Sequence, residues 1–380
     1  MSEVIHDLRI EKMSFGGHGV GRHNGLVIFV PFSAPQDLVD VEVYFSKPSY
    51  KKARILKIKE ASPFRQEPAC EYFGECGGCN WQHLNYETQI AQKQMIVEEQ
   101  LKGILTTESK IFPIVRSPHQ LRYRNRVQLK FSGQKLGFYR RKTHEVLAIQ
   151  DCLITDEKLT SEFKPLSQKL SQRSKDVAKI ELSLSPEGKV QSHHDKNPHE
   201  LSTFSQVNEG VNKILQEAVL NWASGETYSK IYDLYSGQGN FTFPLSQTFP
   251  QTLVEAVELG TENVSRLKKR LNSEGISPFK ILPRQASVDL YLRREMIPEG
   301  SLVLLDPPRT GLSEEVSLAV AQSPWKKLLY ISCDPSALSR DLKIIFKNAP
   351  RKLKIQRVQA FDMFPQTDHV EALIELGVDS

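Results

Sequence analysis

A short stretch in the second half of the chain, Tyr228–Phe241, restricts the fold more than any other segment. An apolar run from Ile231 to Tyr235 is typical of a buried strand, and it leads directly into Gly237 and Gly239. Glycines tolerate a positive φ and let a backbone approach a ligand closely. A helix is expected from the end of the stretch. The pattern therefore predicts a strand, a tight loop and a helix, with which α/β proteins bind a nucleotide-like cofactor.

Three further apolar runs follow, and each ends in a residue whose side chain can bind a ligand or take part in catalysis. Val254–Glu258 ends in an acid about 20 residues after the glycines, where this fold holds ribose hydroxyls. Ser301–Asp306 ends in an acid before two prolines, and Lys327–Cys333 ends in a thiol. Carboxyl ends of successive strands meet at one crevice in open α/β sheets. We therefore expect Gly237, Glu258, Asp306 and Cys333 to line one pocket.

The chain has 380 residues, which is too long for one ordinary core, so two or three domains are expected. No apolar run approaches the length that spans a membrane, and no export signal is visible, so we expect a cytoplasmic protein and a monomer. The net charge is +5, with basic residues beside aromatic ones in residues 44–59 and 122–142. Cations neutralise phosphates and aromatic rings stack on unpaired bases, so this pattern suits an RNA partner, while a merely solvated basic face remains the open alternative.

The first 60 residues read as short β segments joined by glycine-rich turns, and they predict a small antiparallel barrel. The expected strands are Leu8–Met13, Leu26–Pro31, Leu38–Phe45 and Lys52–Lys59. A helix is expected at Tyr86–Leu101. A mixed central region follows, with strands at Arg126–Phe131, Lys135–Arg140 and Lys179–Leu184, and with an exposed polar loop at Ser192–His199. Strands and helices then alternate from the helix Glu209–Trp222 to the end of the chain.

Four of the five cysteines are candidates for a metal site, and the fifth, Cys333, ends a predicted strand. Cys70, Cys76 and Cys79 lie close together around Gly77 and Gly78, in a segment poor in apolar periodicity that suits folding around a metal. Cys152 is the candidate for a fourth thiolate. Four thiolates suit a structural zinc ion or a [4Fe-4S] cluster, and the spacing alone leaves both open.

Cys333 and a carboxylate in the tail Phe361–Glu371 predict a reaction. Carbon-5 of a pyrimidine is too weak a nucleophile to accept a methyl group unaided. A thiolate that adds at carbon-6 converts the ring to an enolate, and carbon-5 then attacks a sulfonium methyl group. A carboxylate next removes the carbon-5 proton, and the thiolate leaves.

The motifs occur in an order that resembles the S-adenosylmethionine-dependent RNA uracil-5 methyltransferases, in particular the TRAM-domain, iron-sulfur branch that acts on 23S rRNA. The resemblance implies a TRAM barrel at the amino terminus, a [4Fe-4S] cluster on Cys70, Cys76, Cys79 and Cys152, the nucleophile Cys333 and the base Glu371. The implied contacts to S-adenosylmethionine are Gln206, Tyr235, Gly237, Asn240, Glu258, Gln285 and Asp306. Two positions depart from the family pattern: Asp334 replaces the usual Asn, and Gln285 replaces an acid or Asn.

The expected fold is therefore a multidomain α/β protein with a Rossmann-like methyltransferase sheet. The predicted domains are a TRAM-like barrel at 1–61, a central domain with the cluster at 62–204, whose helix near 84–103 packs with the catalytic domain in relatives, and a catalytic domain at 205–380. Methylation of tRNA by the same chemistry is the first alternative. A non-catalytic RNA-binding protein with a redox-sensing cluster is the distant one. Arg309 after Asp306-Pro-Pro argues against an adenine-N6 enzyme, which needs an aromatic residue there, and the lack of a cysteine in that loop argues against a cytosine-5 enzyme.

Overall fold

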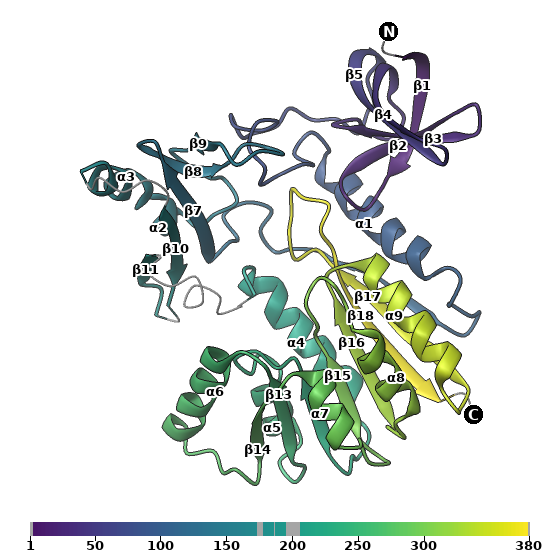
Figure 1. Cartoon of the computed structure of the whole chain (residues 1–380), viewed down its shortest axis with the longest axis vertical. Helices are drawn as coiled ribbons and strands as arrows, with labels where there is room; N and C mark the ends of the chain where they lie inside the picture. The colour runs from purple at the N-terminus through teal and green to yellow at the C-terminus, as the bar shows by residue number, and fades with distance from the viewer. Residues whose placement is uncertain (1–2, 173–177, 186, 195–205, 379–380) are drawn as a thin grey trace. The chain divides into compact units, whose positions relative to one another are not determined.

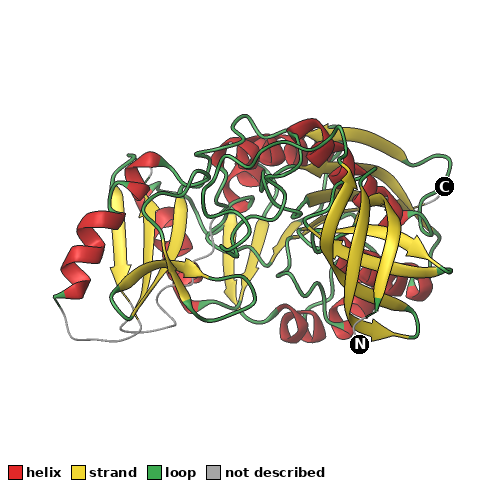
Figure 2. Ribbon diagram, turned by 90° about the horizontal axis from the view of Figure 1, so that it is seen from above, coloured by secondary structure: helices red, strands yellow, loops and turns green. Residues whose placement is uncertain are grey.

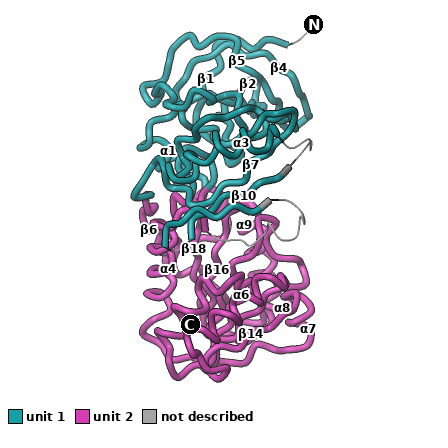
Figure 3. The backbone as a smooth tube through the Cα atoms, turned by 90° about the vertical axis from the view of Figure 1, so that its left-hand side faces the viewer, with its two compact units in different colours: residues 1–96, 117–196, 364–369 teal, residues 97–116, 197–363, 370–380 magenta. Residues whose placement is uncertain are grey.

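A computed structural model describes residues 3–172, 178–185, 187–194 and 206–378 of the chain. The chain divides into two compact units, coloured separately in Figure 3. Unit 1 contains residues 1–96, 117–196 and 364–369, and unit 2 contains residues 97–116, 197–363 and 370–380. The chain thus passes between the two units several times. The short segment 364–369 belongs to unit 1, although the residues on both sides of it belong to unit 2. No described helix has the length and apolar character needed to cross a bilayer.

The amino-terminal part of unit 1 is a closed barrel, drawn as yellow strands near the label N in Figure 2. Its strand order is β1-β2-β3-β5-β4. Its strands are β1 (Val4–Met13), β2 (His18–His23), β3 (Leu26–Pro31), β4 (Leu38–Lys47) and β5 (Tyr50–Glu60). The expected barrel is confirmed, but it is not wholly antiparallel, because β3 and β5 pair in parallel. The alternating apolar residues of β1, β3 and β4 fill its interior, as the pleat of a strand requires.

The glycine-rich segment Gly16–Gly21 was expected to supply turns, yet most of it forms strand β2. A Cβ atom on Gly19 would lie 2.0 Å from Oγ of Ser33, and one on Gly21 would lie 2.7 Å from the carbonyl oxygen of Arg9. The absence of a side chain at these glycines therefore lets β2 approach Ser33 and the backbone of β1 closely, which strand periodicity does not reveal.

The rest of unit 1 contains helix α1 (Tyr86–Leu101), whose last turn belongs to unit 2, and a sheet in the order β11-β10-β7-β8-β9. Its strands are β7 (Arg126–Ser132), β8 (Lys135–Tyr139), β9 (Val146–Ala148), β10 (Ala178–Leu184) and β11 (Val190–His194), with helices α2 (Glu157–Thr160) and α3 (Phe163–Ser171). The helix expected at Tyr86–Leu101 is confirmed. The loop expected at Ser192–His199 is wrong for residues 192–194, which pair with β10, and its remainder lies outside the described residues.

Unit 2 contains an eight-stranded sheet with helices against it (Figure 1). In sheet order the strands are β14 (Ile281–Gln285), β13 (Val254–Glu258), β12 (Ile231–Leu234), β15 (Leu302–Leu305), β16 (Lys327–Ser332), β18 (Glu371–Val378), β17 (Leu353–Phe361) and β6 (Lys110–Val115). The helices are α4 (Glu209–Ala223), α5 (Thr242–Thr248), α6 (Thr261–Ser273), α7 (Val288–Arg294), α8 (Glu314–Gln322) and α9 (Pro335–Asn348).

The first five strands of this sheet are parallel, and β18 runs antiparallel between β16 and β17. The expected Rossmann-like sheet is thus confirmed. Strand β6 comes from the range predicted as the central domain, yet it pairs with β17. Buried side chains of α8, α9 and the strands form one apolar core, which fixes the edge where the strands end.

Candidate active site

The carboxyl ends of the parallel strands of unit 2 lie along one edge of the sheet. Leu234 pairs with both Val257 and Leu305, and Leu305 pairs with Tyr330. The residues that follow these ladders are Tyr235, Glu258, Asp306 and, at the end of β16, Cys333. Gln285 pairs with Glu258 at the end of β14. The expected convergence of these residues at one edge follows directly from the strand register.

The loop after β12 has the backbone that its glycines predicted. Gly237 has φ +56° and Gly239 has φ +90°, and a Cβ atom on Gly237 would meet no protein atom within 4 Å. Tyr235 also has a positive φ of 67°, a strained conformation that concentrates at functional sites. The backbone N–H of Gly237 donates to Oε2 of Glu258 at 3.0 Å. The acid predicted to hold a ribose therefore lies directly beside the glycine loop.

For two other expected cofactor residues, Asn240 and Gln285, the side chains already bond to other residues of the chain. Asn240 exchanges two hydrogen bonds of 2.9 Å with Asn212 of α4, and Gln216 also donates to it. Gln285 is exposed and donates to Oγ1 of Thr261 at 2.8 Å. Gln206 is the first described residue ahead of α4, because residues 204 and 205 of its motif lie outside the described part. Their cofactor contacts stay predictions.

Cys333 and Glu371 meet through the antiparallel ladder of β16 and β18. Ser332 pairs with Ala372, and the next position of the same register is held by Cys333 and Glu371. Cys333 lies one residue past the end of β16, close enough to Glu371 for the charge of the acid to act on the pKa of the thiol. Glu371 is buried and Cys333 is half-buried. The two residues thus lie at adjacent strand ends, although they are far apart in sequence.

The electrostatic surroundings favour the protonated forms of both groups. Burial, and after it the charge of Glu371, raises the pKa of the Cys333 thiol to about 12. Burial also raises the pKa of Glu371 well above its usual range, and Asp306 adds to this effect. The guanidinium of Arg309 opposes both shifts by lowering the two pKa values. Arg309 therefore acts on the site, a role that its position after two prolines did not reveal.

Asp334, which follows Cys333 and replaces the usual Asn of the family, has a structural role. Its Oδ1 atom accepts hydrogen bonds from the N–H groups of Ser336 and Ala337, both at 2.9 Å, and so caps α9. Its charge raises the pKa of Cys333, as expected, but it ranks below burial, Glu371 and Asp306 among the causes. Asn caps a helix equally well, so the substitution costs the fold little.

A third buried acid, Asp233 on β12, lies at the same edge and was not predicted as a site residue. Its Oδ2 atom accepts a hydrogen bond from Oγ1 of Thr242, and its Oδ1 atom has no partner among the described residues. Burial raises the pKa of Asp233 to about 7, and burial with the charge of Asp233 does the same for Asp306. A site with several desolvated carboxyls favours a cationic ligand.

We expect the substitution Asp233→Asn to change stability in a pH-dependent way. The folded pKa near 7 lies above the unfolded value of about 3.9, so the native state binds the proton more tightly and loses stability as the pH rises between these values. A neutral amide does not titrate, so the substitution should be about 1–3 kcal/mol more favourable at pH 8 than at pH 5. Thermal unfolding of the cofactor-free protein and the variant at both pH values measures this difference. An equal effect at the two values would contradict the desolvated carboxyl.

The four expected metal-binding cysteines lie within electrostatic range of one another in unit 1. Burial raises the pKa of Cys76 to about 11 and that of Cys79 to about 12, and Cys152 raises the values of Cys70, Cys76 and Cys79 further. The N–H of Gly78 donates to Sγ of Cys76 at 3.4 Å. Within the described ranges, no three His, Cys, Asp or Glu side chains form a group tight enough for a single metal ion.

The surroundings of these cysteines suit an anionic group. The buried Nε atom of Arg124 has no hydrogen-bond partner in the described part of the chain, and the charge of Arg124 lowers the pKa of Cys76 and of Cys79. A cation held beside four thiols is balanced when the thiols become thiolates around a metal. The donor set and its counter-charge therefore fit the expected group.

The two basic and aromatic clusters predicted from the sequence meet in unit 1. Tyr44 and Phe45 are exposed on β4, and Lys52 lies 5.8 Å from the Phe45 ring centroid. Lys142 of the second cluster lies 5.6 Å from the Tyr44 ring centroid, and Arg141 lies 4.5 Å from that of Phe32. Cations over exposed rings form a surface suited to phosphates and unpaired bases.

Comparison with known families gives two matches along this chain. The profile described as tRNA (Uracil-5-)-methyltransferase matches residues 179–377, more than half of the chain. The TRAM domain profile matches residues 5–56, which contain most of the barrel.

Similar proteins extend over nearly the whole length. The chain is 41% identical to an uncharacterized RNA methyltransferase of Bdellovibrio bacteriovorus, covering 98% of this chain and 95% of that protein. It is 26% identical to the 23S rRNA (uracil(1939)-C(5))-methyltransferase RlmD of Shewanella sediminis, covering 98% and 96%. Its fold is similar to that of the Pyrococcus abyssi tRNA (uracil-54, C5)-methyltransferase, solved with S-adenosyl-L-homocysteine, with a TM-score of 0.71 at 21% identity over 99% of this chain and all of that one.

Proposed function

Because the chain belongs to the family of S-adenosylmethionine-dependent RNA uracil-5 methyltransferases, we propose that it methylates a uridine of 23S rRNA with Cys333 as nucleophile and Glu371 as base. The register of β16 and β18 carries this assignment, since a thiol and a buried carboxyl follow it at adjacent strand ends, on the sheet edge that also carries the glycine loop. A planar ring held there can be approached by both groups. Arg309 supplies a positive charge close to both of them.

The role of Cys333 is to make carbon-5 nucleophilic. Its sulfur forms a bond to carbon-6 of uracil, and the electron pair of the carbon-5 to carbon-6 double bond moves into an enolate. Bound S-adenosylmethionine supplies the electrophilic methyl group and a positive charge that favours ionisation of nearby acids. Burial raises the pKa of the thiol, so a bound positive charge that lowers this pKa favours the thiolate that attacks carbon-6.

Glu371 completes the reaction after methyl transfer. Its carboxylate accepts the proton from carbon-5, the double bond to carbon-6 forms again, and the bond from carbon-6 to sulfur breaks. Cys333 leaves as a thiolate. Arg309, which lowers the pKa of both residues, favours the ionised forms that the two steps require.

We assign the cofactor to the edge formed by the glycine loop and the strand-end acids. Gly237 offers open space beside its backbone, and Glu258 presents a carboxylate to a ribose. The desolvated carboxyls of Asp233 and Asp306 suit a cationic sulfonium compound, because binding a cation favours their ionised forms. Tyr235, Asn240, Gln206 and Gln285 are the further contacts that we propose.

The choice of 23S rRNA over tRNA draws on the full-length similarity to RlmD, whereas the fold is also that of a tRNA enzyme. We expect 5-methyluridine to disappear from one position of 23S rRNA, and from no tRNA, when the gene is deleted. Mass-spectrometric mapping of both RNA classes from deleted and complemented cells measures this. Loss from tRNA alone would transfer the same chemistry to the alternative substrate.

We further propose that Cys70, Cys76, Cys79 and Cys152 hold a [4Fe-4S] cluster, with Arg124 as a counter-charge. The substitution Cys152→Ala should remove most of the iron and the visible absorption of anaerobically purified protein, because three thiolates hold the cluster poorly. Iron and zinc analysis of both proteins measures the effect. The matched control Cys333→Ala should keep its iron. Zinc in place of iron in the unsubstituted protein would favour the structural zinc site.

A further inference from the structure

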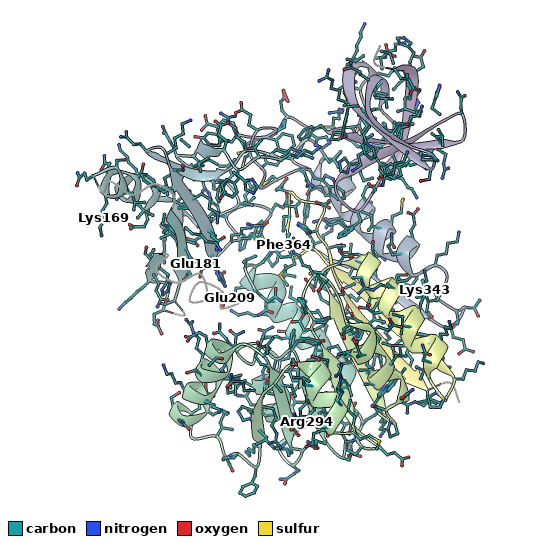
Figure 4. The ribbon with its side chains drawn as sticks, in the orientation of Figure 1. Lys169, Glu181, Glu209, Arg294, Lys343 and Phe364 are labelled. Carbon is teal, nitrogen blue, oxygen red and sulfur yellow. The ribbon has the colours of Figure 1, made fainter. Side chains whose placement is uncertain are left out.

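The segment 364–369 joins β17 to β18, and its contacts place it in unit 1, whereas Met363 and Val370 on either side belong to unit 2. Phe364 at its start is labelled in Figure 4. We propose that Asn80 and Asp368 form a latch that fixes this segment and thereby positions the base Glu371. The inference deepens the proposed function and rests on it.

The latch is a reciprocal pair of side chains completed by the barrel. Nδ2 of Asn80 donates to Oδ1 of Asp368 at 2.6 Å, and the backbone N–H of Asp368 donates to Oδ1 of Asn80 at 3.0 Å. The N–H of Gly16, in the turn between β1 and β2, donates to Oδ2 of Asp368 at 2.7 Å. Both carboxylate oxygens of the buried Asp368 therefore have a donor.

The latch leaves no room for a side chain at the neighbouring turn residue. Gly17 has φ +78°, and a Cβ atom there would lie 2.2 Å from Nδ2 of Asn80. Asn80 itself directly follows Cys79. The barrel turn and the cysteine loop thus both end on the acid that precedes the proposed base by three residues.

Further hydrogen bonds fix the middle of the segment, at Gln366. The carbonyl oxygen of Gln366 accepts from the N–H groups of Asn80 at 3.3 Å and Trp81 at 3.1 Å. The buried side chain of Gln89, on α1, accepts from the N–H of Gln366 at 2.9 Å and donates to its Oε1 at 3.0 Å. Gln366 has φ +70°, a conformation that such surroundings must impose.

Two further groups fix the backbone at the start of the segment. Nζ of the fully buried Lys93 donates to the carbonyl oxygen of Phe364 at 3.0 Å, and the hydroxyl of Tyr123 donates to that of Pro365 at 3.1 Å. Beyond the latch only His369 and the buried Val370 separate Asp368 from Glu371. So short a tether transmits a shift of the segment to the base.

A displaced base has a distinct kinetic signature. A misplacement of about 1 Å costs on the order of a hundredfold in rate. Removal of the carbon-5 proton is the last chemical step, and addition of Cys333 and methyl transfer precede it. A loosened latch should therefore slow turnover while methylated RNA accumulates, bound covalently to Cys333. Simple destabilisation of the fold would lower adduct formation together with turnover.

The test uses an exchange of the two side chains. Asn80→Asp sets two carboxylates against each other, and Asp368→Asn sets two amides together. In the double variant, Nδ2 of the new amide at 368 donates to the new carboxylate, its Oδ1 accepts from Gly16, and the N–H of residue 368 keeps its acceptor. We expect each single variant to lose about tenfold or more in kcat and to accumulate adduct with unmodified RNA, and the double variant to recover both.

Iron content, thermal unfolding and RNA affinity of each variant serve as controls, since a positioning role should leave them near the unsubstituted values. If Asn80→Asp does not fold, Asn80→Ala removes the same bonds without adding a charge and should accumulate adduct as well. Normal turnover, loss of turnover without adduct, or failure of the exchange to restore it would overturn the latch. Glu371→Gln is assayed in parallel: adduct in that variant but not in the latch variants refutes the latch alone, whereas absence from both refutes the proposed mechanism.

Discussion

Replacement of Cys333 by Ala is expected to abolish methylation, with a loss of at least about a thousandfold in rate. The methyl side chain cannot add to carbon-6, and without that addition carbon-5 lacks the electron density to attack a sulfonium. RNA that contains 5-fluorouridine should form a covalent adduct with the unsubstituted protein, because fluorine at carbon-5 cannot be removed as a proton. The variant should form none. Transfer of labelled methyl groups and denaturing gels measure the two effects.

The neighbouring substitution Asp334→Asn is a matched control for this experiment. It keeps a side-chain acceptor for the N–H groups that begin α9, and it removes a charge that raises the pKa of Cys333. The variant should keep its activity and reach it at a slightly lower pH, since a lower thiol pKa gives more thiolate at a given pH. Methylation by Cys333→Ala at an undiminished rate would instead contradict the assignment of Cys333 as the nucleophile.

Much of the catalytic fold is predictable from the sequence, because its strands are fully buried. The run Leu302–Leu305 is continuous and apolar, as parallel strands covered on both faces require, and Ile231–Leu234 is interrupted only by Asp233. Glycines or prolines follow both runs. The place of strand β6 in this sheet was not predicted from the sequence. Its residues are partly exposed at the sheet edge, and its partner β17 comes more than 200 residues later, so no local pattern assigns it to the catalytic sheet.

The site is predictable in part for the same reason. Tyr235, Glu258 and Asp306 follow from the rule that parallel strands end at one edge. The meeting of Cys333 and Glu371 does not, since it depends on β18 entering antiparallel beside β16, which periodicity cannot show. The family resemblance supplied that pairing. Arg309 and Asp233 were missed because their effects arise from burial and charge in three dimensions.

Replacement of Glu371 by Gln should separate the last chemical step from those before it. The amide has nearly the shape of the carboxyl but cannot accept the carbon-5 proton. Addition of Cys333 and methyl transfer can still proceed, so we expect turnover to fall by about 10²–10⁴-fold while a covalent complex with ordinary, unfluorinated RNA accumulates. The complex should contain the labelled methyl group. Denaturing gels and single-turnover methyl transfer measure both quantities.

The outcome of this substitution also tests the electrostatic account of the site. When Glu371 is ionised, its charge is the largest influence after burial that raises the pKa of Cys333. A neutral amide removes that influence, so the thiol should ionise at lower pH, and the pH profile of adduct formation should shift in the same direction. Accumulation of adduct with this shift would support a base that acts after methyl transfer. Loss of activity without adduct would place Glu371 before it, as a residue needed to activate the thiol, because a group that only removes the final proton cannot be required for the first bond to form.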